Sequence, residues 1–319
     1  MQTDKLSRRD ALGKAGLLVG AALAVPALSG STARAVAGGN DGPFRFCLNT
    51  ATIRGQKLGI VKEIEIAAQA GYDSIEPWVD AVQAYVSGGG KPADLKSRIV
   101  DAGLTVEGAI GFPEWIVNDE EKRRKGMDRA KREMELMTQI GARRFAAPPA
   151  GATDLPRLDV FAAAERYREL LEAGSQLGIV PQLELWGFSK NLNRLGECIW
   201  VAMEADHPQA CVLADVFHLY KGGSGFHGFR FLGPNAVQVL HMNDFPSEPA
   251  RDKIDDSYRV FPGDGTAPFA EILRDFHNTG GQKVLSLEVF NRKYWEQDAL
   301  EAAKEGLAKM KAVAAKALA

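Results

Sequence analysis

Four side chains in the second half of the chain could bind a metal ion, and each follows or ends a short apolar run. They are Glu184, Asp215, His241 and Glu288. A charged side chain inside an apolar run is unfavourable unless it is paired or coordinates a cation. Three carboxylates brought together would repel one another, and a divalent cation removes that repulsion. This oxygen-rich set favours Mn²⁺, with Mg²⁺ or Co²⁺ as alternatives, over a structural zinc site.

Other interpretations of these and neighbouring residues stay open at this point. Any single carboxylate in the set could instead pair with an arginine or lysine, although recurrence on four consecutive strands favours the metal site. His218, three residues after Asp215, could be a core histidine, a group behind the ligands or a substrate contact. Glu76 and Glu107 could reach the site from earlier strands or form salt bridges beneath it, and His227 could line it.

The apolar runs alternate with helical patterns along the chain. Strands are predicted at 44–49, 74–78, 104–110, 144–147, 179–186, from 210 onward, at 236–244 and at 283–290. Helices are predicted at 58–71, 93–102, 120–140, 159–177, 192–205, 268–279 and from 298 to the end. The glycine-rich stretch 221–235 shows little helical pattern.

This alternation predicts a parallel sheet, and its most economical closed form is the (β/α)8 TIM barrel. An open doubly wound sheet is the alternative, but it would normally carry a glycine-rich turn after its first strand. Residues 49–54 contain no such turn. In a barrel the carboxyl ends of the strands converge on one face, so the four candidate ligands would meet there.

Several short motifs resemble the xylose-isomerase-like TIM-barrel superfamily, in its sugar phosphate isomerase and epimerase group. They are Leu183-Glu184, Asp215-Val-Phe-His218, His241-Met-Asn-Asp244, Pro262-Gly-Asp-Gly265 and Leu287-Glu288. The resemblance extends from about Phe44 to the last helix. It implies one divalent metal on the four candidate ligands, a substrate contact by His218 and a homodimer. It also implies an arginine contact after the seventh strand, for which Arg259 is the candidate ahead of Arg251.

The implied chemistry is proton transfer beside a carbonyl through an enediolate, with a metal polarising the substrate. Glu184 and Glu288 would act as the general acid and base. Trp78 and Trp186, at strand ends, would stack on a sugar. We expect an isomerase or epimerase of a non-phosphorylated or keto sugar. A sugar lyase or dehydratase on the same scaffold, including elimination from a 3-keto-glycoside, is the alternative.

Two other classes fit the residues less well. A non-catalytic periplasmic sugar-binding protein would be expected to have lost one of the paired glutamates, and both are present. A phosphoester hydrolase with three zinc ions would need histidines after the second and third strands, where Glu76-Pro-Trp78 and Gly111-Phe112 stand instead. The net charge of −2 indicates no nucleic-acid partner.

The N-terminus has the pattern of an export signal. Ser7-Arg8-Arg9-Asp10 precedes an uncharged stretch at 15–28 and two candidate cleavage motifs, Ala33-Arg34-Ala35 and Ala35-Val36-Ala37. The paired arginines resemble a twin-arginine signal, which exports folded proteins. We expect residues 1–37 to be this signal, residues 38–319 to be one domain, and the protein to be periplasmic. An uncleaved anchor is the alternative, but the apolar stretch is short beside the ~20 residues of a membrane span.

The cysteines suggest no disulfide framework. The chain has three, Cys47, Cys198 and Cys211, with no close spacing typical of a zinc motif. Cys47 and Cys211 lie in apolar runs, which predicts buried free thiols.

Overall fold

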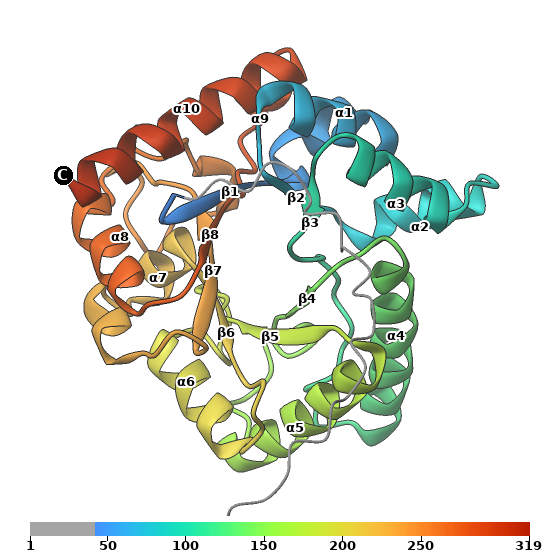
Figure 1. Cartoon of the computed structure of the whole chain (residues 1–319). Coiled ribbons are helices and arrows are strands. Elements are labelled where there is room, and N and C mark those ends of the chain that lie inside the picture. Colours follow the sequence, from blue (N-terminus) through green and yellow to red (C-terminus); the bar gives the residue numbers. More distant parts are fainter. Residues whose placement is uncertain (1–41) are drawn as a thin grey trace, which may run out of the picture. The chain divides into compact units, whose positions relative to one another are not determined.

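The computed structural model describes residues 42–319, so the predicted signal at 1–37 lies outside the described residues. Eight parallel strands form its centre, seen end-on in Figure 1. They are β1 (Phe44–Asn49), β2 (Ser74–Glu76), β3 (Thr105–Val106), β4 (Arg144–Ala147), β5 (Val180–Glu184), β6 (Val212–Asp215), β7 (Val237–Met242) and β8 (Lys283–Leu287).

The strand pairing closes the sheet into the predicted barrel. The order is β3-β2-β1-β8-β7-β6-β5-β4, so the first strand pairs with the last. Between β3 and β4, a hydrogen bond from Ala146 N to Ala109 O, 2.9 Å long, spans the ends of the sheet. The fold is a (β/α)8 barrel, which confirms the prediction and excludes the open sheet.

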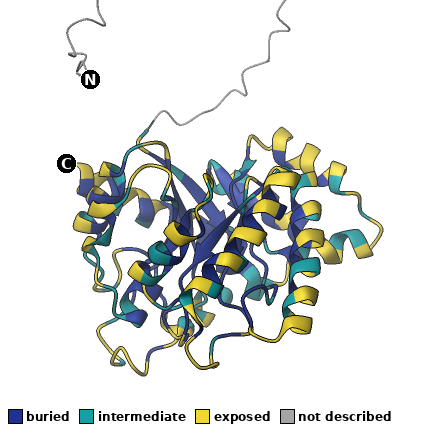
Figure 2. Ribbon diagram, turned by 90° about the horizontal axis from the view of Figure 1, so that it is seen from below, coloured by how far each residue is buried: buried dark blue, intermediate teal, exposed yellow. Residues whose placement is uncertain are grey.

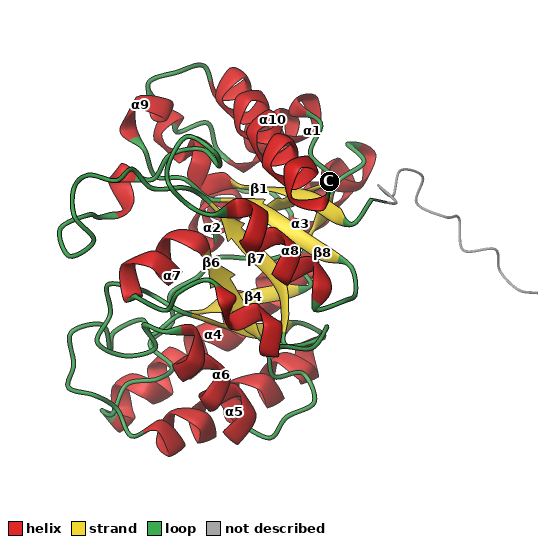
Figure 3. Cartoon of the chain, turned by 90° about the vertical axis from the view of Figure 1, so that its left-hand side faces the viewer, coloured by secondary structure: helices red, strands yellow, loops and turns green. Residues whose placement is uncertain are grey.

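Helices surround the strands (Figures 1 and 3). They are α1 (Ile60–Ala70), α2 (Val79–Ser87), α3 (Pro92–Asp101), α4 (Glu120–Gln139), α5 (Val160–Leu177), α6 (Leu195–Glu204), α7 (Val216–Gly222), α8 (Phe269–Asn278), α9 (Arg292–Trp295) and α10 (Ala299–Leu318). Asp119 and Asp159 cap α4 and α5 by accepting hydrogen bonds from backbone N–H groups. Gly71 and Gly178 end α1 and α5 in the left-handed conformation, as the glycine after each helical pattern predicted.

The strands are buried on both faces, as Figure 2 shows by their dark colour inside a shell of partly exposed helices. Outward-facing strand residues pack against the helices. A second apolar cluster alternates with them along the strands and therefore fills the inside of the barrel. Its members are Cys47, Ile110, Ala146, Leu213, Val239 and Val284. This packed layer supports the side chains at the carboxyl ends of the strands.

Three helices, α2, α7 and α9, were absent from the sequence prediction. Helix α7 begins directly after β6, because the Asp215 carboxylate caps it by accepting a 2.7 Å hydrogen bond from His218 N. Helix α2 begins shortly after β2, with Trp78 at its N-cap and no side-chain capping hydrogen bond. Helices this short show too few turns for a periodic pattern. His218 therefore lies in the first turn of a helix and not at a strand end.

Cys47, Cys198 and Cys211 are all buried and free, which confirms the two predicted buried thiols. Within residues 42–319, no helix is both long enough and apolar enough to cross a membrane.

Candidate metal centre and active site

The barrel brings the four predicted ligands together at the carboxyl ends of β5 to β8. Glu184 and Asp215 are the last residues of β5 and β6, His241 lies near the end of β7, and Glu288 follows β8. All four are at most 4% exposed. Because each strand delivers one side chain to the same place, adjacent parallel strands convert residues distant in sequence into one cluster.

His241 Nδ1 is at the centre of this cluster. It lies 3.2 Å from Glu288 Oε2, and 3.8 Å from both Glu184 Oε1 and Asp215 Oδ2. Two ligands that share an ion with bonds of about 2.1 Å lie about 3.0–3.4 Å apart. The observed separations are close to this spacing.

Two buried atoms of the cluster, His241 Nδ1 and Glu184 Oε2, have no hydrogen-bond partner among the described residues. Buried polar atoms normally form hydrogen bonds, so two neighbouring atoms without a hydrogen-bond partner need an explanation. Donor atoms of Glu184, His241 and Glu288 also lie within 4.8 Å of one another. The residues present therefore fit a divalent cation, with Asp215 as the fourth candidate at the edge of the group.

Glu76 supports His241 from behind, which decides one question that the sequence left open. The His241 Nε2 atom lies 2.9 Å from Glu76 Oε2, and this oxygen also accepts hydrogen bonds from Asn49 Nδ2 and Ser286 Oγ, at 2.9 and 2.7 Å. A carboxylate on the outer nitrogen fixes the orientation of a metal-binding histidine. Here it turns Nδ1 toward the carboxylates of Glu184 and Glu288.

Arg259 lies inside the cluster and not only at its edge. Its guanidinium is 2.9 Å from Asp215 Oδ2, 3.1 Å from Glu288 Oε2 and 3.1 Å from His218 Nε2. It is 1% exposed, and the rings of Phe217 and Phe290 lie near its faces. The sequence predicted a substrate contact here. The structure also gives Arg259 a second task, which is to balance the negative charge of two candidate ligands.

The other sequence candidates separate into two groups. Trp78, Trp186 and His218 line the same cavity as the cluster. Glu107 does not reach it: its carboxylate pairs with Arg45, Arg143 and Arg144, and Arg144 begins β4 at the opposite end of the barrel. This is the salt bridge beneath the pocket that the sequence allowed.

His227 does not line the cavity either. It is exposed on the outside, and its ring nitrogens lie 3.8 Å from carboxylates of Glu271 and Asp275. Arg251, the second choice for the arginine contact, is also absent from the cavity wall. The sequence missed Asn243, which donates a 2.8 Å hydrogen bond to Asp215 Oδ2 and accepts one from Phe217 N. Its place two residues after His241 was the available signal.

Burial and mutual repulsion shift the proton equilibria of the cluster. Burial raises the pKa of Glu184 to about 8, with the carboxylates of Glu288 and Asp215 adding to the rise and His241 opposing it. Burial disfavours the charged form of His241, but Glu288 and Glu76 outweigh it and hold the His241 pKa well above its ordinary value. Burial lowers the pKa of His218, helped by Arg259. A carboxyl group with a pKa near neutrality suits proton transfer.

The cavity above the cluster has a volume of about 230 Å³. It is lined by Trp78, Ile110, Phe112, Glu184, Trp186, Phe188, His218, Asp256, Arg259, Glu288 and Phe290. Two candidate acid–base carboxylates, a histidine and an arginine thus share one small space with an aromatic wall. The arrangement can bind a small polar molecule and exchange protons with it.

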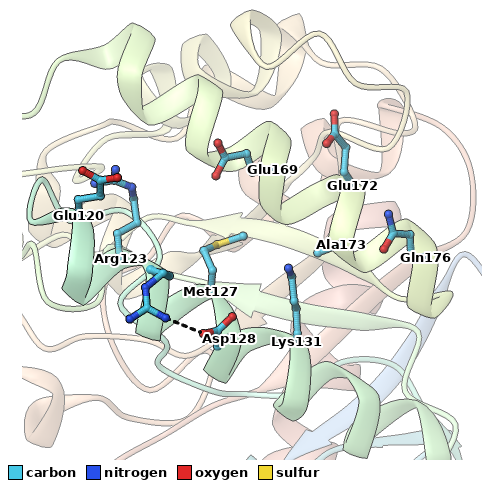
Figure 4. A pocket seen from close by; sticks show the side chains of 10 residues that line it. Glu120, Arg123, Met127, Asp128, Lys131, Glu169, Glu172, Ala173 and Gln176 are labelled. Atoms are coloured by element: carbon cyan, nitrogen blue, oxygen red, sulfur yellow. Dashed lines mark ion pairs between the residues drawn. The ribbon is translucent and has the colours of Figure 1, made fainter.

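A larger hollow of about 490 Å³ lies outside the barrel between α4 and α5. Figure 4 shows charged side chains of both signs along it. Arg124 and Asp128 form an ion pair there, at 3.7 Å. The side chains of Arg124 and Asp128 are 66% and 49% exposed, so this ion pair is solvated. We therefore place the functional site at the barrel mouth, where buried charges converge.

Comparison with known proteins agrees with the assignment of the fold as a (β/α)8 barrel. Residues 64–313 match the family described as xylose isomerase-like TIM barrel. The chain belongs to this family. The protein is similar to the IolI protein, whose crystal structure has a bound zinc atom, with a TM-score of 0.78 and 20% identity. That match covers 85% of this chain and 98% of the other, and it shows the fold alone.

The relatives within the family differ in reaction. A 3-dehydroshikimate dehydratase of Pseudomonas putida is 25% identical over 248 residues, which is 77% of this chain but 38% of that protein's length. An inosose isomerase of Bacillus licheniformis is 22% identical over 270 residues, covering 81% of this chain and 93% of the isomerase. The family scaffold thus carries both dehydratases and isomerases, as the sequence motifs implied.

Proposed function

We propose that this protein is a divalent-metal-dependent isomerase or epimerase that moves a proton next to the carbonyl of a non-phosphorylated or keto sugar. The observation that carries the proposal is the pair Glu184 and Glu288, which line one cavity and also share a buried cluster with His241. The inosose isomerase relative supports the isomerase class. A small-molecule sugar is accordingly the proposed partner.

Glu184, Asp215, His241 and Glu288 would hold the cation, which would supply polarisation of the substrate carbonyl. The oxygen-rich set favours Mn²⁺, with Mg²⁺ and Co²⁺ as alternatives. The zinc of the IolI structure makes Zn²⁺ a further ion to compare.

The chain's own groups carry out the remaining steps. Glu288 is held by hydrogen bonds from Asn49 and Arg259, at 3.1 Å each, and can remove a proton from a carbon placed above it. Glu184, which lines the same cavity, can return a proton. Arg259 and His218 would bind substrate oxygens, while Trp78 and Trp186 would contact the carbon skeleton.

Solvent exchange tests the proposal. In D₂O, the metal-loaded protein should catalyse the incorporation of deuterium into a suitable ketose, at the carbon next to its carbonyl. NMR of the ketose measures this exchange. Glu184→Gln and Glu288→Gln should each reduce the rate about 10²-fold or more, because each removes one proton-transfer group. Exchange that continues at the wild-type rate in Glu288→Gln would exclude this carboxylate as a catalytic group.

The alternative is a metal-dependent sugar lyase or dehydratase, including 3-keto-glycoside elimination. The dehydratase relative from Pseudomonas putida favours it. Loss of a β-substituent after removal of the same proton needs no further residue. Release of the substituent together with deuterium exchange would identify this reaction, whereas exchange without release supports the isomerase.

Export through a twin-arginine signal at 1–37, with a periplasmic mature domain, is also proposed from the paired Arg8 and Arg9. Replacing both arginines by lysine should retain the precursor in the cytoplasm, which cell fractionation measures. A homodimer is the proposed assembly, and the mass of the purified protein in solution tests it.

A further inference from the structure

The walls of the cavity above the cluster are aromatic around much of its mouth. Ring centroids of Phe290 and Trp78 lie 6.0 Å apart, those of Trp78 and Phe112 5.2 Å, those of Phe112 and Trp186 5.7 Å, and those of Trp186 and Phe188 5.3 Å. We call these five residues the aromatic rim. They follow β2, β3, β5 and β8, so they enclose a ligand from several sides.

Most of the polar groups that line the cavity are bonded to one another through Arg259. Arg259 bonds to Glu288 and to His218, each at 3.1 Å, and to Asp256 at 2.5 Å. The polar end of Trp78 is also occupied, because its Nε1 donates a 3.0 Å hydrogen bond to Asn49 Oδ1. The rim thus presents mainly ring carbon to a ligand, while the buried polar groups Glu184, His218, Arg259 and Glu288 lie beneath it and the partly exposed Asp256 pairs with Arg259.

A sugar bearing hydroxyl groups on all sides suits this cavity poorly. Its reacting carbonyl and adjacent hydroxyl would meet the charged floor, but hydroxyls against the rim would lose water without gaining partners. One aromatic ring commonly packs against the C–H face of a sugar. Five rings from four loops offer more apolar contact area than one face of a sugar can use. A flat apolar group would fill this area best.

We propose that the substrate is a keto sugar or related hydroxy-ketone that carries a flat apolar substituent, such as an aryl group, and that the aromatic rim binds this substituent. The inference rests on the proposed function for the position of the hydroxy-ketone. It adds the chemical class of the rest of the molecule.

The experiment compares three small hydroxy-ketones that differ in one substituent. These are 2-hydroxyacetophenone with phenyl, hydroxyacetone with methyl and dihydroxyacetone with hydroxymethyl. Titration calorimetry on protein loaded with Mg²⁺ gives the dissociation constants. The phenyl compound should bind about tenfold tighter than hydroxyacetone, and dihydroxyacetone should bind most weakly.

Two variants localise the effect. Phe188, 47% exposed at the rim, can be changed to alanine with little disturbance of the core. Phe188→Ala should reduce the preference for phenyl over methyl by about fivefold, because one ring of the enclosure is removed. Phe161→Ala, on the outer surface of α5 where Phe161 is 59% exposed, should leave the preference unchanged.

Equal affinities, tighter binding of dihydroxyacetone, undetectable binding of the phenyl compound, or identical effects of both variants would each overturn the inference. Deuterium exchange on the same compounds separates it from the proposed function. Tight phenyl binding without any exchange would refute the function and keep the substrate class. Fast exchange and tight binding with dihydroxyacetone would keep the function and refute the class.

Discussion

The role of a buried carboxylate in this protein depends on its hydrogen-bond and ion-pair partners. Glu76 and Glu107 are both buried glutamates at the ends of early strands, with 2% exposure each. The Glu76 carboxylate lies within hydrogen-bond distance of the His241 ring, whereas the Glu107 carboxylate forms ion pairs with three arginines. Identical side chains thus support the candidate metal centre in one place and balance the charge of arginines in the other.

Glu76→Gln should weaken metal binding about 10–100-fold, because an amide holds the His241 ring less firmly than a carboxylate. Elemental analysis and calorimetric titration with Mn²⁺ measure the effect. Glu107→Gln is the matched control, since it removes an equally buried carboxylate that pairs with arginines and not with His241. Equal loss of affinity in both variants would show that Glu76 acts through general stability and not through His241.

At the scale of elements, the loop from β7 to α8 is what carries Arg259 into the site. Asp244 organises this loop: its carboxylate accepts hydrogen bonds from the backbone N–H groups of Gly263, Gly265 and Ala267, each at 2.9 Å. The backbone of Asp244 also pairs with Val260, the neighbour of Arg259. The position of the arginine therefore depends on a residue that does not touch the cavity.

Asp244→Ala should release this loop. We expect faster hydrogen exchange at the amides of Gly263, Gly265 and Ala267, and weaker binding of substrate as Arg259 loses its fixed position. Mass spectrometry of exchanging peptides measures the first effect. Asp264→Ala changes a surface residue of the same loop that pairs with Lys309, and it should leave both properties unaltered. Unchanged exchange in Asp244→Ala would contradict the assigned role.

At the scale of the whole molecule, stability depends on charges that folding removes from water. Glu63 in α1 is 5% exposed, and its Oε2 has no hydrogen-bond partner in residues 42–319. Burial raises its pKa from 4.5 to about 7, opposed by Arg54. At a pH between these two pKa values, Glu63 is deprotonated in the unfolded chain but protonated in the folded chain. The free energy of unfolding therefore falls as the pH rises through this range.

Glu63→Gln should remove this loss. The variant and the wild type should have similar free energies of unfolding near pH 4, and the variant should be more stable at pH 8 by roughly 1–3 kcal/mol. Urea unfolding at the two pH values measures this difference. Glu65→Gln, which changes an exposed partner of Lys62 on the same helix, should not gain stability at pH 8. A pH-independent difference for Glu63→Gln would contradict the titration.

The sequence by itself determined the barrel and the four candidate ligands. Strands buried on both faces and glycine-ended helices leave strong local patterns, and parallel strands place their carboxyl ends on one face whatever the details of packing. For that reason the sequence alone groups Glu184, Asp215, His241 and Glu288.

Only the tertiary structure determined which residues far apart in the sequence contact one another. The partners of Glu76 and Glu107 come from distant strands, the Asp215 cap starts a helix too short to show a period, and Arg259 reaches the ligands through a loop held by Asp244. The aromatic rim likewise unites loops after four strands. Contacts between residues far apart in sequence depend on the register and closure of the sheet, and these exist only in the folded chain.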